Sequence, residues 1–245
     1  MNILMYHLVG QGRGPMSVPL RRFTEQMELL AAGGYRLLTE DDLHAHVSSA
    51  APFPADAVLL TFDDGYANTV TTVLPVLDRL ALPAIMALCG GYLGADLPRR
   101  VRHPVQEMAD LGQVRRWIAS GRDVAAHSYT HHRLPPESDL ALRWQVGGDH
   151  EAHAQLLGTA ARTFVYPYGA HARRVRDIVA QWYPLALTTD EHHRPDATRP
   201  YELPRIQVDP TWPLESFRTA LDSDIDPAGA QLAARRTGTD PRSEE

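Results

Sequence analysis

Two adjacent carboxylates follow a short apolar run. Asp63 and Asp64 come directly after residues 57–62, and Gly65 follows them. Successive side chains of a strand point to opposite faces, but Gly65 permits a sharp turn that can bring both carboxylates to one edge of a sheet. In βα folds this edge, at the carboxyl ends of the strands, is where functional sites are built. The alternative is a pair of turn residues that cap the next helix.

His127 and His131 form the second reactive group. His127 directly follows the apolar run 123–126, and His131 lies four residues later. This spacing can bring two imidazoles to one side of a helical turn. Two imidazoles and one carboxylate are the ligands of a hydrolytic site for zinc or a similar divalent cation, with positions left for water and substrate. Since both groups stand at strand ends, the sequence favours one shared site.

Composition excludes several other chemistries. All 24 basic residues are arginine, which removes Schiff-base and phosphate-loop lysines. The single cysteine, Cys89, removes disulfides and multi-thiolate zinc sites. A net charge of −6 with scattered arginines argues against a nucleic-acid partner. The sequence has no apolar run of the roughly 18 residues that a membrane span needs, and its start lacks signal-peptide features, so we expect a cytoplasmic protein.

Alternating strand and helix patterns must position these residues. Strands are predicted at 3–6, 57–62, 84–88, 123–126, 163–166, 185–187 and 206–208. Helical periodicity joins Phe23 to Leu30, Val73 to Leu80 and Val114 to Ile118, and Thr39 with Asp42 predicts a capping box. We expect one α/β domain over residues 1–225, as a closed barrel or an open doubly wound sheet, and a mobile tail over 226–245.

Four motifs resemble those of a known family. Thr-Phe-Asp-Asp-Gly at 61–65 and His-Ser-x-x-His at 127–131 resemble the first two motifs of the NodB-homology polysaccharide deacetylases, carbohydrate esterase family 4. Pro-Tyr-Gly at 167–169 is similar to the third, and Met-Tyr-His at 5–7 is similar to the branch of the poly-N-acetylglucosamine deacetylases. The resemblance spans about residues 1–210. It implies a distorted (β/α) barrel of about seven parallel strands and metal-dependent hydrolysis of an N-acetyl amide.

The resemblance also implies a role for each matched residue. Asp64, His127 and His131 would be the metal ligands, and Asp63 the catalytic base. The backbone N–H of Tyr168 would stabilise the oxyanion. The metal would be zinc, with cobalt, nickel or iron as alternatives.

Two departures from the family pattern lead to further predictions. Residues 203–208 lack the Leu-x-His motif that supplies the catalytic acid in many members, so His7 is predicted to take that role. Val165 stands where many members carry an arginine that tethers the base. Arg205, from the last strand, is predicted to replace it, because a guanidinium fits a carboxylate in a bidentate way.

The remaining alternatives concern substrate and the other reactive residues. The leading substrate is an N-acylated amino sugar or polysaccharide; a non-sugar amide, as for a deformylase, or a non-catalytic carbohydrate-binding module are the alternatives.

Other reactive residues are expected to have no role in the site. Four histidines are expected to be solvated: His44, His46, His192 and His193. The spacing of His150 and His153 does not suit a zinc helix. Ser128 lacks a nucleophile elbow. Tyr66, Tyr168, Trp182 and Trp212 are either a sugar-stacking platform or core residues.

Overall fold

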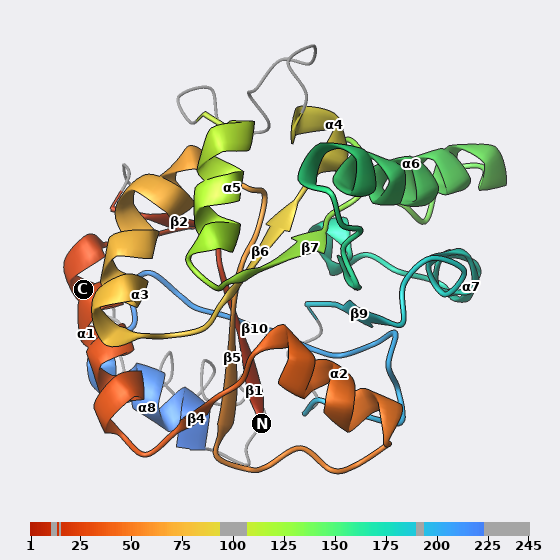
Figure 1. Ribbon diagram of the computed structural model, residues 1–245. Helices are drawn as coiled ribbons and strands as arrows, with labels where there is room; N and C mark the ends of the chain where they lie inside the picture. Colours follow the sequence, from red (N-terminus) through yellow and green to blue (C-terminus); the bar gives the residue numbers. More distant parts are fainter. Residues whose placement is uncertain (11–13, 15, 94–106, 190–193, 223–245) are drawn as a thin grey trace, which may run out of the picture.

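Parallel strands form the centre of the molecule, and helices surround them (Figure 1). The computed structural model describes residues 1–10, 14, 16–93, 107–189 and 194–222. Seven strands follow one another in the order β10-β1-β5-β6-β7-β8-β9, with β4 beside β5, and every pairing in this sheet is parallel. The sheet curls into the distorted (β/α) barrel that the family resemblance implies.

The sheet strands are β1 (Asn2–Tyr6), β4 (Arg36–Leu37), β5 (Ala57–Phe62), β6 (Ile85–Leu88), β7 (Asp123–Ala126), β8 (Thr163–Val165), β9 (Leu185–Leu187) and β10 (Ile206–Gln207). Two further short strands, β2 (Leu8–Val9) and β3 (Ser17–Val18), pair with each other. The α-helices are α1 (Leu20–Ala32), α2 (Glu40–Ser48), α3 (Leu74–Leu80), α4 (Gly90–Leu93), α5 (Leu111–Ala119), α6 (Asp139–Leu157), α7 (Arg173–Val179) and α8 (Leu214–Asp222). A π-helical turn, η1 (Thr69–Val73), precedes α3, and a 3₁₀ turn, η2 (Pro167–Gly169), follows β8.

One short segment joins the two edges of the curled sheet. Leu203 pairs with Leu187 of β9, and three residues later Ile206 pairs with Leu4 of β1. Residues 203–207 therefore contact the last strand on one side and the first strand on the other. The barrel alternative is correct, and the open doubly wound sheet is wrong, because this segment bridges strands that an open sheet would leave as separate edges.

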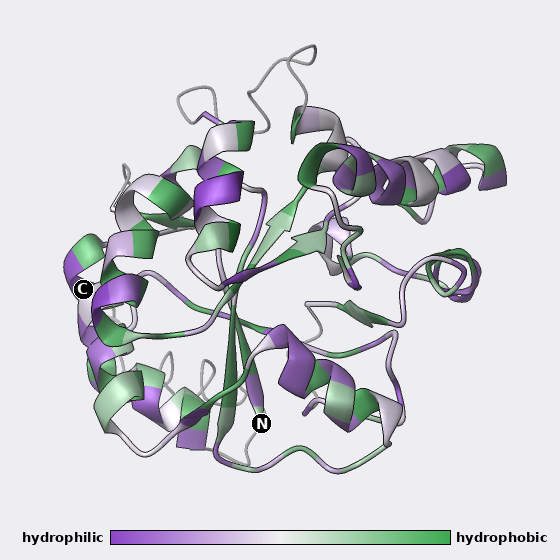
Figure 2. Ribbon diagram, viewed as in Figure 1, coloured by the Kyte–Doolittle hydropathy of each residue, from purple (hydrophilic) through white to green (hydrophobic). Residues whose placement is uncertain are grey.

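Alternation along the strands separates the core into inner and outer parts. Within β5, Leu59 packs inside the barrel with Ile3 and Val165, whereas Leu60 and Phe62 pack outward against the helices. A second outer cluster lies beneath α6 and α7. The ribbons of β5 and β6 are mostly hydrophobic in colour and all of their residues are buried, whereas the helices mix hydrophobic and hydrophilic residues (Figure 2). This pattern is typical of strands that are buried on both faces.

The predicted strands match the observed ones to within one residue at each end, and Thr39 caps α2 through a complete capping box with Asp42. The strands β2, β3 and β4 have two residues each and are too short to show a periodicity. Sequence periodicity also does not identify α6, since Gly147 and Gly148 interrupt it.

The predicted tail over 226–245 lies outside the described residues. Among the described helices, none has the length and apolar content to cross a membrane.

Glu40 connects α2 to the amino end of β8. Its carboxylate accepts hydrogen bonds from Thr163 Oγ1 at 2.6 Å and from Arg162 Nη2 at 2.9 Å, and it lies 3.7 Å from His44 Nε2. The expectation that His44 is solvated is wrong, because this ring is largely buried and also contacts Thr163 at 3.1 Å. Burial raises the pKa of Glu40, but hydrogen bonds with His44 and Thr163 and the charge of Arg162 outweigh it, so the pKa is lowered.

We expect Glu40→Gln to lower the free energy of unfolding at pH 7 by about 1–3 kcal/mol, because a buried charged hydrogen-bond acceptor is lost. The folded pKa of Glu40 lies below its ordinary value of 4.5. The difference between wild type and variant should therefore be complete above that value and disappear as the pH falls through the folded pKa. Urea unfolding between pH 3 and pH 7 measures it. Glu28→Gln, at an exposed salt bridge, is the control, and an equal pH dependence in both variants would contradict the assignment.

Candidate functional site

The candidate site lies at the carboxyl ends of the strands, where strand alternation determines which side chains point inward. Inward residues of β1, β5 and β7 include Ile3, Leu59 and Ala125. Continuing the same period of two places His7, Asp63 and His127 on the inner side just beyond each strand. The three residues are buried, with 8%, 2% and 1% of their surface exposed. A simple alternation thus directs three candidate residues to the same end of the barrel.

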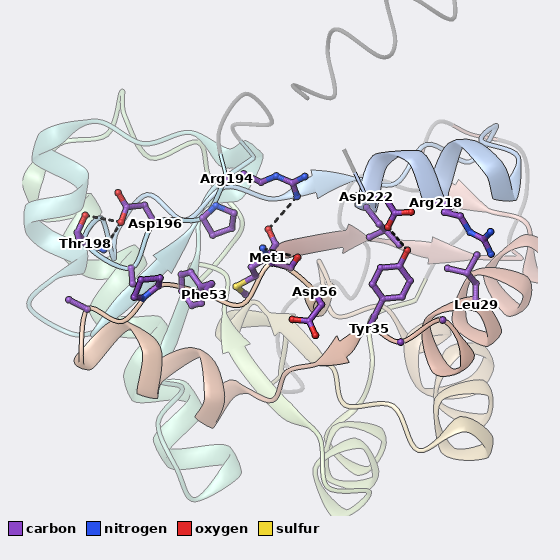
Figure 3. Close-up of a pocket in the computed structure, with 18 residues that line it drawn as sticks. Met1, Leu29, Tyr35, Phe53, Asp56, Arg194, Asp196, Thr198, Arg218 and Asp222 are labelled. Carbon is purple, nitrogen blue, oxygen red and sulfur yellow. Dashed lines mark hydrogen bonds between the residues drawn. The ribbon is translucent and has the colours of Figure 1, made fainter. Parts of the chain in front are cut away.

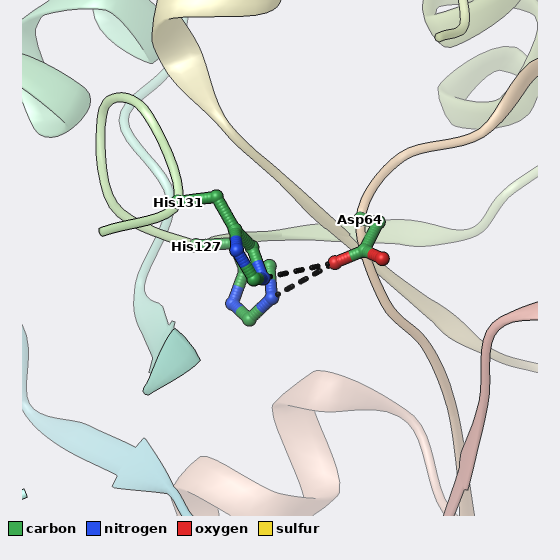
Figure 4. Close-up of side chains that lie close together, drawn as sticks. All are labelled: Asp64, His127 and His131. Carbon is green, nitrogen blue, oxygen red and sulfur yellow. Dashed lines mark ion pairs between the residues drawn. The ribbon is translucent and has the colours of Figure 1, made fainter. Parts of the chain in front are cut away.

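Asp64, His127 and His131 converge on one point (Figure 4). Asp64 Oδ1 lies 3.4 Å from His127 Nε2 and 3.1 Å from His131 Nε2. Within the described residues, these three form the group of histidine, cysteine and acidic side chains whose donor atoms could hold a metal ion. All three are buried.

The hydrogen bond on the far side of His127 determines what its inner nitrogen can do. His127 Nδ1 lies 2.8 Å from the carbonyl oxygen of Val165, and a carbonyl can only accept. Nδ1 therefore carries the proton, and in the neutral ring Nε2 presents a lone pair to Asp64. Two acceptors at that distance repel one another, so either a proton on Nε2 or a metal cation has to lie between them. The donor set thus fits a divalent metal, with the second hydrogen bond that metal-binding histidines ordinarily make.

The same carboxylate raises the pKa of His127. Burial lowers this pKa, but the hydrogen bond with Asp64 and the charges of Asp63 and Asp64 outweigh burial. Burial likewise raises the pKa of Asp64, yet His127 and His131 hold it well below its ordinary value. The negative charge of Asp64 is therefore kept at neutral pH, as metal binding requires.

Left-handed backbone conformations turn these side chains toward one another. Asp64, Ser128, His131 and Tyr168 have φ values of 70°, 60°, 58° and 62°. The turn after β5 begins at Asp64 itself, one residue before the predicted Gly65. Residues 127–131 form a bend rather than the predicted helical turn. Left-handed non-glycine residues cost on the order of 1 kcal/mol each and often cluster at functional sites.

Arg205 holds Asp63 by two parallel hydrogen bonds. Arg205 Nη1 donates to Asp63 Oδ1 at 2.7 Å, and Nη2 donates to Oδ2 at 2.8 Å. The guanidinium also donates to Thr61 Oγ1 and to the carbonyl of Thr188, each at 3.1 Å, and it is 1% exposed. Burial raises the pKa of Asp63, but Arg205 outweighs burial and lowers it. Asp63 is therefore ionised although it is enclosed.

His7, Asp63, Asp64, His127, His131 and Tyr168 line one cavity of about 530 Å³. Burial lowers the pKa of His7, and attraction to Asp64 and Asp63 offsets only part of this effect. The Tyr168 ring lies 5.0 Å from that of His131 and is 43% exposed, at the rim of the cavity. The structure thus gathers every candidate residue except Arg205 on the cavity wall, with Arg205 directly behind Asp63.

The four aromatic residues considered for sugar stacking separate into two pairs. Tyr66 and Tyr168 line the cavity. Trp182 instead packs against Gly147 of α6, and Trp212 packs against the outer core. A platform of all four is therefore wrong. Ser128 is fully buried, and His192 and His193 lie outside the described residues.

A larger cavity of about 1100 Å³ lies at the opposite, amino-terminal end of the strands (Figure 3). Met1, Tyr35, Phe53 and Asp222 are among its described lining residues, and none of these lining residues belongs to the candidate site. Active sites of (β/α) barrels lie at the carboxyl ends of the strands. We therefore place the candidate active site in the smaller cavity of about 530 Å³.

Residues 50–183 match the profile of a protein family described as polysaccharide deacetylase. The poly-β-1,6-N-acetyl-D-glucosamine N-deacetylase of Escherichia coli K12 is 29% identical over 207 residues, which are 84% of this chain but only 26% of that protein. This chain thus spans about a quarter of that relative.

Solved structures share the fold. The Streptococcus pyogenes deacetylase PplD superposes with a TM-score of 0.79 at 21% identity, covering 91% of this chain and 98% of PplD. IcaB from Ammonifex degensii superposes with a TM-score of 0.74 at 22% identity, covering 91% and 97%.

We expect the chain to bind one divalent cation through Asp64, His127 and His131. Zinc at about 100 times its Kd should raise the free energy of unfolding by about 2.7 kcal/mol. Affinity should fall as the pH drops through the raised pKa of His127, because a protonated imidazole cannot bind a cation. Thermal unfolding with and without zinc measures the effect. His131→Gln should abolish it, and the adjacent, exposed His132 provides the control His132→Gln. Equal stabilisation of both variants would contradict this site.

We expect Arg205→Met to lower the free energy of unfolding by about 3–5 kcal/mol, because Asp63 is left buried without its cation. The loss should shrink at acidic pH, where protonation neutralises the carboxyl group whose pKa burial now raises. Urea unfolding of the single variants and of Arg205→Met/Asp63→Asn gives the coupling between the two side chains. Strict additivity of the two changes would show that the pair does not interact.

Proposed function

This chain belongs to the polysaccharide deacetylase family, and from that premise we propose that it removes N-acetyl groups from an amino sugar by metal-dependent hydrolysis. One observation supports this most strongly. An ionised, arginine-paired Asp63 faces the same cavity as the three converging donors of Asp64, His127 and His131. A base beside a divalent-cation site is the arrangement that activates water for attack on an amide.

Each residue then has a distinct role. A divalent cation held by Asp64, His127 and His131 would polarise the acetyl carbonyl and lower the pKa of a water molecule. Asp63 accepts the proton of the attacking water, while Arg205 keeps the carboxylate ionised and oriented. The backbone N–H of Tyr168 donates to the developing oxyanion, a contribution of about 3 kcal/mol where it is well aligned.

His7 is the acid of this proposal. Amide cleavage needs a proton on the departing amine, and His7 is an imidazole in the cavity for which no other role has been assigned. Because burial lowers its pKa, the ring is mostly neutral at pH 7 before reaction. We therefore assign His7 to relay the proton that Asp63 takes from water: Asp63 gives it to His7, and His7 donates it to the nitrogen of the departing amine, so that both side chains return to their starting forms.

The substrate we propose is an oligomer of N-acetylglucosamine. Support comes from the Escherichia coli relative, whose name gives a β-1,6-linked polymer of this sugar as its substrate, although this chain spans about a quarter of that protein. The cavity volume of about 530 Å³ suits one or two sugar units rather than a small amide alone. Exposed Tyr168 at the rim offers a ring face to a sugar.

Hydrolysis of β-1,6-linked N-acetylglucosamine oligomers, followed as acetate release and as new free amine, tests the function. We expect turnover by the zinc- or cobalt-loaded protein and its loss after chelation. Asp63→Asn and His7→Gln should each lower kcat by about 10²–10⁴ with a smaller change in KM. Asp56→Asn, at an exposed carboxylate at the opposite end of the strands from the candidate site, is the matched control.

The same assay decides among the alternatives. Turnover of an N-formyl or non-sugar amide with none of the oligomer would favour the small-amide hydrolase. Oligomer binding without any acetate release, in metal-loaded wild type, would favour a carbohydrate-binding module. Unchanged turnover in Asp63→Asn would remove Asp63 from the role of base.

A further inference from the structure

The carboxyl end of β6 supports metal-ligand residues on both of its sides. β6 lies between β5, which leads to Asp64, and β7, which leads to His127. The backbone N–H of His127 donates to the carbonyl of Leu88, the last residue of β6, at 2.9 Å. A Cβ on Gly65 would lie 2.6 Å from Leu88 Cδ2, so the turn after Asp64 packs directly on the same residue. A shift of Leu88 therefore moves both ligand segments.

Helix α6 holds this end of β6 through two fully buried side chains. Asp149 Oδ1 accepts a hydrogen bond of 2.5 Å from the backbone N–H of Gly90. A Cβ on Gly90 would lie 2.7 Å from that oxygen, so glycine is needed for the close approach. One helical turn later, His153 Nε2 lies 3.3 Å from the Leu88 carbonyl oxygen and 3.8 Å from Asp149 Oδ1. Both side chains are 0% exposed.

The buried carboxyl group of Asp149 requires an explanation, because burying a carboxyl oxygen without a hydrogen-bond partner costs free energy. Asp149 Oδ2 accepts no hydrogen bond within the described part of the chain. Burial raises the pKa of Asp149 to about 7, and the backbone N–H groups of Gly90, His127 and Ser128 oppose that rise. The carboxyl group is therefore surrounded by the N–H groups of two loops, one of which carries a ligand.

We propose that Asp149 is a positioning residue for the metal site. The hydrogen bond from Gly90 to Asp149 fixes the start of α4 against α6 and so determines the position of Leu88. The position of Leu88 in turn determines the separation of His127 from Asp64. This inference rests on the proposed metal-dependent function. Groups behind metal ligands commonly affect metal affinity by 10-fold to 100-fold, although they do not contact the ion.

Asp149→Asn in the full chain tests the proposal. The Kd for zinc and for cobalt is measured by competition with a chelator, together with the visible spectrum of bound cobalt and urea unfolding of the metal-free protein. We expect the Kd to rise about 10-fold to 100-fold and the cobalt spectrum to change. Glu151→Gln, an exposed acid-to-amide change on the same helix, should leave both unchanged.

The outcomes separate positioning from a merely structural role. A variant that loses stability without metal but binds cobalt with wild-type affinity and spectrum would overturn the proposal. If Asp149→Asn does not fold, Gly90→Ala decides with the same measurements, since its methyl group would push the Asp149 carboxyl away from residue 90 without changing the chemical nature of that side chain. Wild-type protein that binds neither cation would instead refute the metal site, and the inference with it.

Discussion

A carboxylate inside a barrel has to be paired, and the pair between Asp63 and Arg205 determines much of this molecule. An unpaired ion of this kind would cost several kcal/mol in an apolar interior. The compensating guanidinium comes from residues 203–207, the segment that bridges β9 and β1. The segment that closes the barrel therefore also supplies the positive charge of Arg205, which compensates the energetic cost of burying Asp63. Thr61 and Thr188 accept from two further N–H groups of the guanidinium, so four of its five donors have a partner.

Strand alternation explains why so much of the site was predictable from the sequence. His7, Asp63 and His127 each follow an inward residue by two or four positions, and a period of two extends past the strand end without any tertiary information. Their types and order along the chain then sufficed to predict one shared site. The prediction of a barrel came from the family resemblance, because the local strand and helix patterns fitted an open doubly wound sheet equally well.

The features that the sequence did not reveal depend on contacts between distant segments. The bend at residues 127–131 relies on left-handed Ser128 and His131, which no local preference favours. His44 is buried because Glu40 and Thr163 approach it from different elements. Asp149 lies on a helix whose periodicity two glycines obscure. One of them, Gly147, allows close packing of α6, because a Cβ there would lie 2.7 Å from the ring of Trp182. Such residues become meaningful only when their neighbours are known.

The pairing of Asp63 also limits the chemistry available to it. By lowering the pKa, Arg205 keeps Asp63 in the form that can accept a proton, yet it also makes the carboxylate a weaker base. An aspartate of low pKa cannot by itself deprotonate ordinary water at a useful rate, so the water must be made more acidic. The three donors converging beside it fit a cation that would do so. The arginine that stabilises the fold and the proposed cation are thus two parts of one requirement of the proposed mechanism: the first keeps Asp63 ionised, and the second would make a weak base sufficient.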